Sequence, residues 1–324
     1  MFVRVLVIAM VSALVGVACG DQEGAGDPSP ASTTAPVPDE LPPAPAPTIS
    51  TVTTQPPPPE TEATEPASSE APPSGVDFTL AVVEFSGTYA EVLVPTGTGP
   101  FPAAVTVHGG GYTRGSPESM RPMAELLARN GFLVFNTAYH LSTPTDPAFP
   151  TAMHDVACAM RLAASHPDSD GTVAVVGVSA GAHAGGLVAV TGDLYGDDCS
   201  APPATATRYV GLGYIDITGT NTVKPPGLDP LFQVPDEEVS AELRAAGDPI
   251  NHVGANPGLM TLLVHAEDDE ITSLAAAEQM LAALTGAGQL AELAIVPGIG
   301  HFDLSTVEFT GATVVEWLLD NPAN

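Results

Sequence analysis

The segment GVSAG at residues 177–181 places a serine in the pattern G-x-S-x-G. It follows an apolar run at 173–178 and leads into an Ala- and Gly-rich segment at 180–191, which predicts a strand, a sharp turn and a helix. Such a turn projects the serine Oγ above the edge of a sheet, and the helix N-terminus behind it favours developing negative charge. The pattern therefore indicates that Ser179 is a nucleophile.

A serine hydroxyl is a weak nucleophile and needs a base that an acid orients. His301 follows the apolar run 291–296 in the sequence Gly-Ile-Gly-His, and Asp269 follows the apolar run 261–266. Both residues leave the C-terminal ends of predicted parallel strands, where ligands bind in open α/β sheets. We expect His301 to serve Ser179 as general base and then acid, with Asp269 as the orienting acid.

Two other carboxylates compete with Asp269 for the place of the acid. Asp268 is its immediate neighbour, and Asp216 follows the apolar run 209–214. Related arrangements take the acid from either strand, so the sequence leaves this choice open.

The segment HGGGY at residues 108–112 follows the apolar run 103–108. Three glycines let backbone N–H groups turn inward without obstruction by side chains. We assign an oxyanion hole to the N–H groups of Gly109 and Gly110, together with that of Ala180 after the nucleophile.

Strand-like runs alternate with helix-like stretches after residue 76, which indicates a single α/β domain. The first two runs carry some alternation and predict an antiparallel hairpin, whereas the later ones are continuously apolar, as in parallel strands buried on both faces. We expect a mostly parallel eight-stranded sheet with helices on both faces. The predicted strands are 79–85, 89–94, 103–108, 132–139, 173–178, 209–214, 261–266 and 291–296, and the predicted helices are 118–129, 150–165, 180–191, 272–285 and 305–319.

The N-terminal part of the chain reads as an export signal and a spacer. Residues 1–18 carry one cation and a short apolar run, and VGVAC with Cys19 resembles the lipobox of bacterial lipoproteins. Residues 19–75 hold 15 prolines and nine acids but no Lys, Arg or aromatic residue, a composition that predicts a disordered linker. The catalytic domain is expected at 76–324, exported and held at the cell surface by a lipid on Cys19, with plain secretion as the alternative.

The formal net charge of −30 excludes most binders of nucleic acid, which need a basic face. It also leaves the lipid anchor as the expected membrane contact. The remaining cysteines, Cys158 and Cys199, are an even pair in an exported chain and predict a disulfide. No cluster of His or Cys has metal-ligand spacing, and we expect no metal site.

Together these motifs resemble the α/β-hydrolase fold, in particular HGG-containing esterases related to hormone-sensitive-lipase-like esterases and the BD-FAE subset. HGGGYTRG at 108–115, SAGAH at 179–183, the segment AYHLS at 138–142 and DPINHV at 248–253 carry the resemblance. It implies hydrolysis of carboxylic esters, often with short acyl chains and without a cofactor. It also implies that His183 is a structural residue of the helix.

The resulting hypothesis is a surface-anchored serine esterase acting on a small-molecule or cell-envelope ester. Amide hydrolysis on the same scaffold and a catalytically silent binding module are the alternatives. The segment 215–258 is predicted either to form a partial cap over the site or to be a surface excursion. The natural substrate and the oligomeric state do not follow from the sequence.

Overall fold

The computed structural model describes residues 75–216 and 229–323. In this part of the chain the strands form one eight-stranded sheet in the order β1-β2-β4-β3-β5-β6-β7-β8. β2 pairs antiparallel with β1 and with β4, and the remaining neighbours are parallel. The strands are β1 Phe78–Phe85, β2 Thr88–Pro95, β3 Phe101–Val107, β4 Leu133–Thr137, β5 Ser169–Val178, β6 Arg208–Leu212, β7 Met260–Ala266 and β8 Ala291–Val296.

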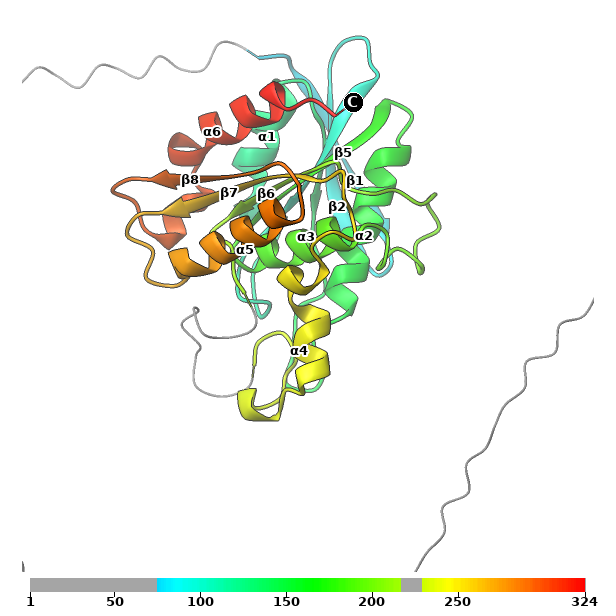
Figure 1. Cartoon of the computed structure of the whole chain (residues 1–324). Helices are drawn as coiled ribbons and strands as arrows, with labels where there is room; N and C mark the ends of the chain where they lie inside the picture. Colours follow the sequence, from blue (N-terminus) through cyan, green and yellow to red (C-terminus); the bar gives the residue numbers. More distant parts are fainter. Residues whose placement is uncertain (1–74, 217–228, 324) are drawn as a thin grey trace, which may run out of the picture. The chain divides into compact units, whose positions relative to one another are not determined.

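Helices cover both faces of the sheet (Figure 1). The helix pair α1 and α6 lies on one face, and α2, α3 and α5 lie on the other. The predicted mostly parallel eight-stranded α/β sheet is therefore confirmed. The helices are α1 Arg121–Arg129, α2 Thr151–Ser165, α3 Ala180–Thr191, α4 Ala241–Gly247, α5 Leu274–Gly286 and α6 Val307–Asp320.

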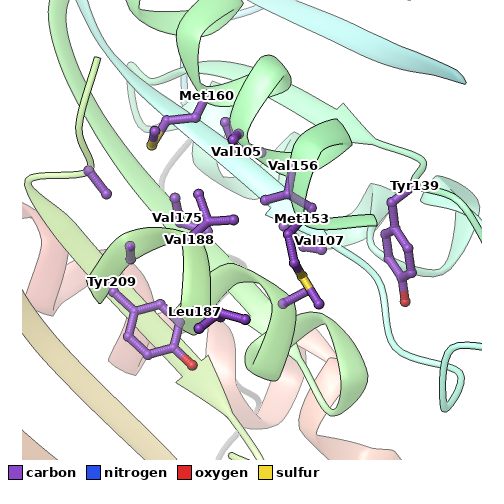
Figure 2. Packing of buried hydrophobic residues seen from close by; sticks show 14 of the residues in the cluster. Val105, Val107, Tyr139, Met153, Val156, Met160, Val175, Leu187, Val188 and Tyr209 are labelled. Atoms are coloured by element: carbon purple, nitrogen blue, oxygen red, sulfur yellow. The ribbon is translucent and has the colours of Figure 1, made fainter. Parts of the chain in front are cut away.

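Alternating side chains of the central strands divide the core into two layers. Val105 and Val107 of β3 pack with Met153 of α2 and Leu187 of α3 (Figure 2). Ala104, the residue before Val105, belongs to the layer beneath α1 and α6. Because both faces are buried, the central strands read as continuous apolar runs, which is why the sequence revealed them.

The limits of several elements differ from prediction at glycine and proline. β6 ends at Leu212 rather than at 214, because Gly213 has a φ of +63°. α1 begins at Arg121, not at 118, because Pro117 opens a separate 3₁₀ turn and Pro122 lies in the first turn of α1. α4 was not predicted: it is a seven-residue helix inside a polar segment, capped by the Ser240 side chain.

The predicted signal peptide, Cys19 and nearly all of the predicted linker lie outside the described residues. The same holds for 217–228, so the predicted cap at 215–258 is described only in part. Within residues 229–258, α4 and the turn Pro249–His252 follow one another, and the turn packs against α3. The position of α4, beyond the sheet on the side of α3 and α5, is visible in Figure 1.

Candidate active site

Ser179 occupies the sharp turn between β5 and α3, with φ 55° and ψ −121°. A residue other than glycine in this region costs about 1–3 kcal/mol and persists only where its surroundings hold it. The Ser179 N–H donates to Leu212 O of the neighbouring strand β6 at 2.8 Å. A Cβ on Gly181 would lie 2.2 Å from Val107 O, so only glycine allows this turn to lie against β3.

The structure brings Ser179 and His301 together, although 122 residues separate them. His301 Nε2 lies 2.9 Å from Ser179 Oγ, and His301 Nδ1 lies 2.8 Å from Asp269 Oδ2. The parallel strands β5, β6, β7 and β8 are consecutive in the sheet, so their C-terminal ends lie along one edge. The loops that leave β5, β7 and β8 at this edge carry the three side chains.

Asp269 is held as an ionised acceptor. Its Oδ1 accepts from the N–H groups of Ile271 and Thr272 at 2.8 and 2.7 Å, and its Oδ2 accepts from Thr272 Oγ1 at 2.7 Å. Burial by itself would raise the pKa of Asp269, but the hydrogen bonds from His301, Thr272 and Ile271 outweigh it and lower the pKa to about 2. A carboxylate in this state keeps the proton of the histidine on Nδ1 and leaves Nε2 free to accept one.

The other two candidates for the acid have different surroundings. Asp268 is exposed, and its N–H donates to Ile299 O at 3.1 Å in the loop before His301. Asp216 is buried, four residues beyond the end of β6. The hydrogen bond at His301 Nδ1 is made by Asp269.

The glycine loop after β3 lies directly beside the serine. A Cβ on Gly109 would lie 3.2 Å from Ser179 Cβ and 3.1 Å from Val178 O. Within the described residues, the N–H groups of Gly109, Gly110 and Ala180 have no hydrogen-bond acceptor. Unpaired donors of this kind, beside Ser179 and the N-terminus of α3, are suited to an oxyanion.

The side chains of His108 and His183 are both buried. The ring of His108 stacks on that of Tyr139 with centroids 4.3 Å apart, and burial lowers the pKa of His108. His183 contacts Tyr112 and Gly247 O. The implied structural place of His183 in the helix agrees with this position, but its link to Tyr112 was not anticipated, because that contact joins two motifs 71 residues apart.

His265 on β7 is a neighbour of the site that the sequence reasoning passed over. It is 3% exposed, and burial lowers its pKa while the charge of Asp269 opposes this effect. Its Nδ1 has no hydrogen-bond partner in the described part of the chain. A titratable residue in a strand that otherwise has none was the signal that could have drawn attention to it.

Cys158 on α2 and Cys199, beyond the end of α3, are joined by a disulfide. Their Cα atoms are 5.2 Å apart, within the range that a disulfide spans. The bridge ties α2 to the loop after α3, as predicted from the two cysteines.

Neither range of the described chain contains a helix long and apolar enough to cross a membrane. Residues 75–216 and 229–323 likewise contain no group of three His, Cys, Asp or Glu side chains arranged to hold a metal ion.

The sheet order, the serine turn and the loop donors define an α/β-hydrolase fold, and solved structures support this assignment. A truncated carbohydrate esterase from gut microbiota has a TM-score of 0.62 at 17% identity, covering 77% of this chain and 98% of that one. Carboxyl esterase 2 of the fungus Tuber melanosporum has a TM-score of 0.59 at 21% identity, covering 75% of this chain and 86% of its own. Apo esterase 2 of Thermogutta terrifontis has a TM-score of 0.57 at 18% identity, covering 78% and 97%.

Within that fold, residues 91–211 match the BD-FAE family model. This match confirms the resemblance read from the motifs at 108–115 and 179–183. An acetyl-hydrolase of Streptomyces hygroscopicus is 28% identical over 172 residues, covering 51% of this chain and 56% of the hydrolase. The chain thus aligns with only about half the length of this relative.

Proposed function

We propose that this protein is a serine esterase that hydrolyses carboxylic esters with short to medium acyl chains. One observation carries the proposal: His301 Nε2 lies 2.9 Å from Ser179 Oγ while Nδ1 lies 2.8 Å from the buried Asp269 carboxylate. The match to BD-FAE and the similarity to an acetyl-hydrolase and a carboxyl esterase support an ester substrate rather than another acyl compound.

The geometry assigns a role to each group. Ser179 Oγ attacks the carbonyl carbon of the ester as His301 Nε2 takes its proton, and Asp269 stabilises the imidazolium. The N–H groups of Gly109, Gly110 and Ala180 donate hydrogen bonds to the negatively charged carbonyl oxygen. In comparable sites, removal of one such donor costs about 2.7–4 kcal/mol of transition-state stabilisation.

The second half of the cycle reverses these proton transfers. His301 returns its proton to the alcohol oxygen as the carbon–oxygen bond breaks, leaving an ester on Ser179. Water then attacks the acyl carbon while His301 accepts its proton, and the carboxylic acid leaves as the proton returns to Ser179 Oγ. Every proton is accounted for by one imidazole and one water.

Turnover of p-nitrophenyl acetate, butyrate and octanoate by the purified protein and by Ser179→Ala tests the proposal. We expect turnover that falls at least about 10³-fold in Ser179→Ala, as for other hydrolases of this type. Ser116→Ala, a serine in the loop before α1, is the matched control and keeps full activity. The trend from acetate to octanoate measures the size of the acyl pocket.

A fluorophosphonate probe separates the alternatives. Labelling of Ser179 without turnover of any ester would move the assignment to amide substrates. Folded protein with neither turnover nor labelling would favour the alternative that the protein is a catalytically silent binding module.

The proposal also includes export and attachment of a lipid to Cys19. A disulfide between Cys158 and Cys199 is consistent with an oxidising compartment. Metabolic labelling with an alkyne fatty acid, followed by fractionation, tests the anchor: Cys19→Ala should lose the label and leave the membrane fraction. A wild-type chain without label, found in the medium, would favour plain secretion.

A further inference from the structure

The oxyanion loop has an unusual backbone. Gly110, Gly111 and Tyr112 follow one another with φ values of +119°, +59° and +61°. Glycine adopts such values readily, but tyrosine does so only where contacts hold it there. The contacts that hold Tyr112 in this conformation therefore also hold the loop that presents the Gly109 and Gly110 N–H groups.

Tyr112 is held mainly through its side chain. Its ring is 6% exposed and makes edge contacts with the rings of Tyr139 and His183, at centroid distances of 6.1 and 5.8 Å. Its hydroxyl forms a hydrogen bond with His183 Nδ1. Its backbone oxygen accepts from the Ser142 N–H at 2.7 Å. The hydroxyl bond joins the loop to helix α3.

The direction of this bond follows from the second nitrogen of the same imidazole. His183 Nε2 lies 2.8 Å from Gly247 O, at the C-terminal end of α4. A carbonyl oxygen only accepts, so Nε2 carries the proton and Nδ1 accepts from the Tyr112 hydroxyl. Burial lowers the pKa of His183 to about 4 and raises that of Tyr112 well above its ordinary value, so both groups are neutral near pH 7.

His183 also lies one helical turn beyond the nucleophile. Its N–H donates to Ser179 O at 3.0 Å, within the first turn of α3. That turn supplies the third oxyanion donor, the Ala180 N–H. A side chain on this turn thus holds the loop that supplies the other two donors.

We propose that His183 is a positioning residue whose bond to the Tyr112 hydroxyl sets the spacing between the loop donors and the Ala180 N–H. The inference rests on the proposed esterase function. It predicts that deleting the Tyr112 hydroxyl lowers kcat, because the donors bind the oxyanion of the transition state more strongly than the ester carbonyl. KM, which reflects binding of the ground state, should change little.

Tyr195→Phe is the matched control for Tyr112→Phe. Tyr195 is 8% exposed, and its hydroxyl donates to Ala246 O at 3.4 Å, one residue before Gly247. Both variants delete one buried tyrosine hydroxyl, and only Tyr112 belongs to the oxyanion loop. A general loss of packing would affect both alike.

Two substitutions of His183 each keep one of its side-chain hydrogen bonds and remove the other. In His183→Asn, the carboxamide oxygen takes the place of Nδ1 and still accepts from Tyr112. In His183→Gln, the carboxamide nitrogen takes the place of Nε2 and still donates to Gly247 O, but the acceptor for Tyr112 is lost.

The experiment measures kcat and KM for p-nitrophenyl acetate, together with the midpoint of urea unfolding, in the full chain. We expect kcat to fall about ten- to a hundredfold in Tyr112→Phe and His183→Gln, since a shift of about 1 Å in a reacting group costs up to about a hundredfold. His183→Asn should stay within about threefold of wild type, and so should Tyr195→Phe. The double variant Tyr112→Phe/His183→Gln should fall no further than either single variant, because both remove one bond.

Equal kcat in Tyr112→Phe and Tyr195→Phe, in an active wild type, would overturn the inference while leaving the esterase proposal intact. Equal losses in His183→Asn and His183→Gln would also overturn it. An inactive wild type that no phosphonate labels would overturn the esterase proposal first, and this inference with it.

A spectroscopic measurement is independent of turnover. The ¹⁵N shifts of His183 should show a neutral ring protonated on Nε2 from pH 5.5 to 8. A ring protonated on Nδ1, or on both nitrogens, would contradict the assigned direction of the bonds.

Discussion

Asp269 Oδ2 accepts from both His301 Nδ1 and Thr272 Oγ1, at 2.8 and 2.7 Å. The same carboxyl therefore orients the imidazole and is itself oriented by the chain that follows β7. Because its pKa lies at about 2, Asp269 stays ionised across the whole pH range in which an esterase assay is practical.

Asp269→Asn should lower kcat for p-nitrophenyl acetate by roughly 10³–10⁴-fold, because an amide nitrogen facing Nδ1 favours the wrong tautomer of His301. The control is Asp268→Asn, the exposed neighbour, which should keep kcat within about twofold. Steady-state kinetics on the two variants decides between the carboxylates. A large loss in Asp268→Asn with an active Asp269→Asn would reverse the assignment.

Gly110→Ala should lower kcat by about 10²–10³-fold, the loss associated with one oxyanion donor. A Cβ at this position would lie 2.0 Å from Arg114 O, so the loop has to move. Gly111→Ala is the comparison, because a Cβ there meets nothing within 4 Å. Its φ of +59° costs about 1 kcal/mol in stability for alanine, with a much smaller effect on kcat. Similar kcat values for both variants would remove this loop from the oxyanion site.

Asp155→Asn should change how stability depends on pH. Burial raises the pKa of Asp155 to about 6, although the hydrogen bond from the His140 N–H acts in the opposite direction and lowers it. A raised pKa means that the unfolded chain releases this proton first, so the free energy of unfolding falls as pH rises from about 4 to about 6. The free energy of unfolding falls by about 3 kcal/mol over this range and does not change further with this group at higher pH.

Asparagine has no carboxyl group to titrate, so the free energy of unfolding of the variant should lack this fall. Its side-chain oxygen can still accept from the His140 N–H. Urea unfolding at pH 4, 6 and 8 measures it, with the exposed Glu292→Gln as control. Parallel pH curves for wild type and Asp155→Asn would show that Asp155 titrates alike in the folded and unfolded chain.

Removal of the disulfide should weaken the fold without disabling the site. The bridge spans 41 positions, and closing a loop of that length in the unfolded chain is worth about 4 kcal/mol in the chain-entropy account. Cys158→Ala/Cys199→Ala should therefore unfold at a lower urea concentration and keep kcat at 25 °C within about twofold. A double variant with unchanged stability would mean that the bridge constrains the unfolded chain little.

Local patterns predicted much of the sheet because burial on both faces leaves a strong signal. The predicted apolar runs lie in β3, β5 and β7, but β5 begins four residues earlier than predicted, with the polar segment 169–172. α4 was missed because seven residues are too few for periodicity to show, and a helix this short depends on its tertiary contacts. The limits of β6 and α1 shifted because single glycine and proline residues end or begin elements.

The sequence by itself determined the candidate nucleophile, because the strand, the glycines and the helix around Ser179 are all local. It also determined the order of serine, acid and histidine, and the presence of a glycine loop after β3. Only the tertiary structure placed the Asp269 carboxylate against His301 Nδ1 and joined Tyr112 to His183. These contacts span 32 and 71 residues. The parallel register of β5 to β8 and the packing of α3 against the loop after β3 create them, and no local pattern of residue types encodes either.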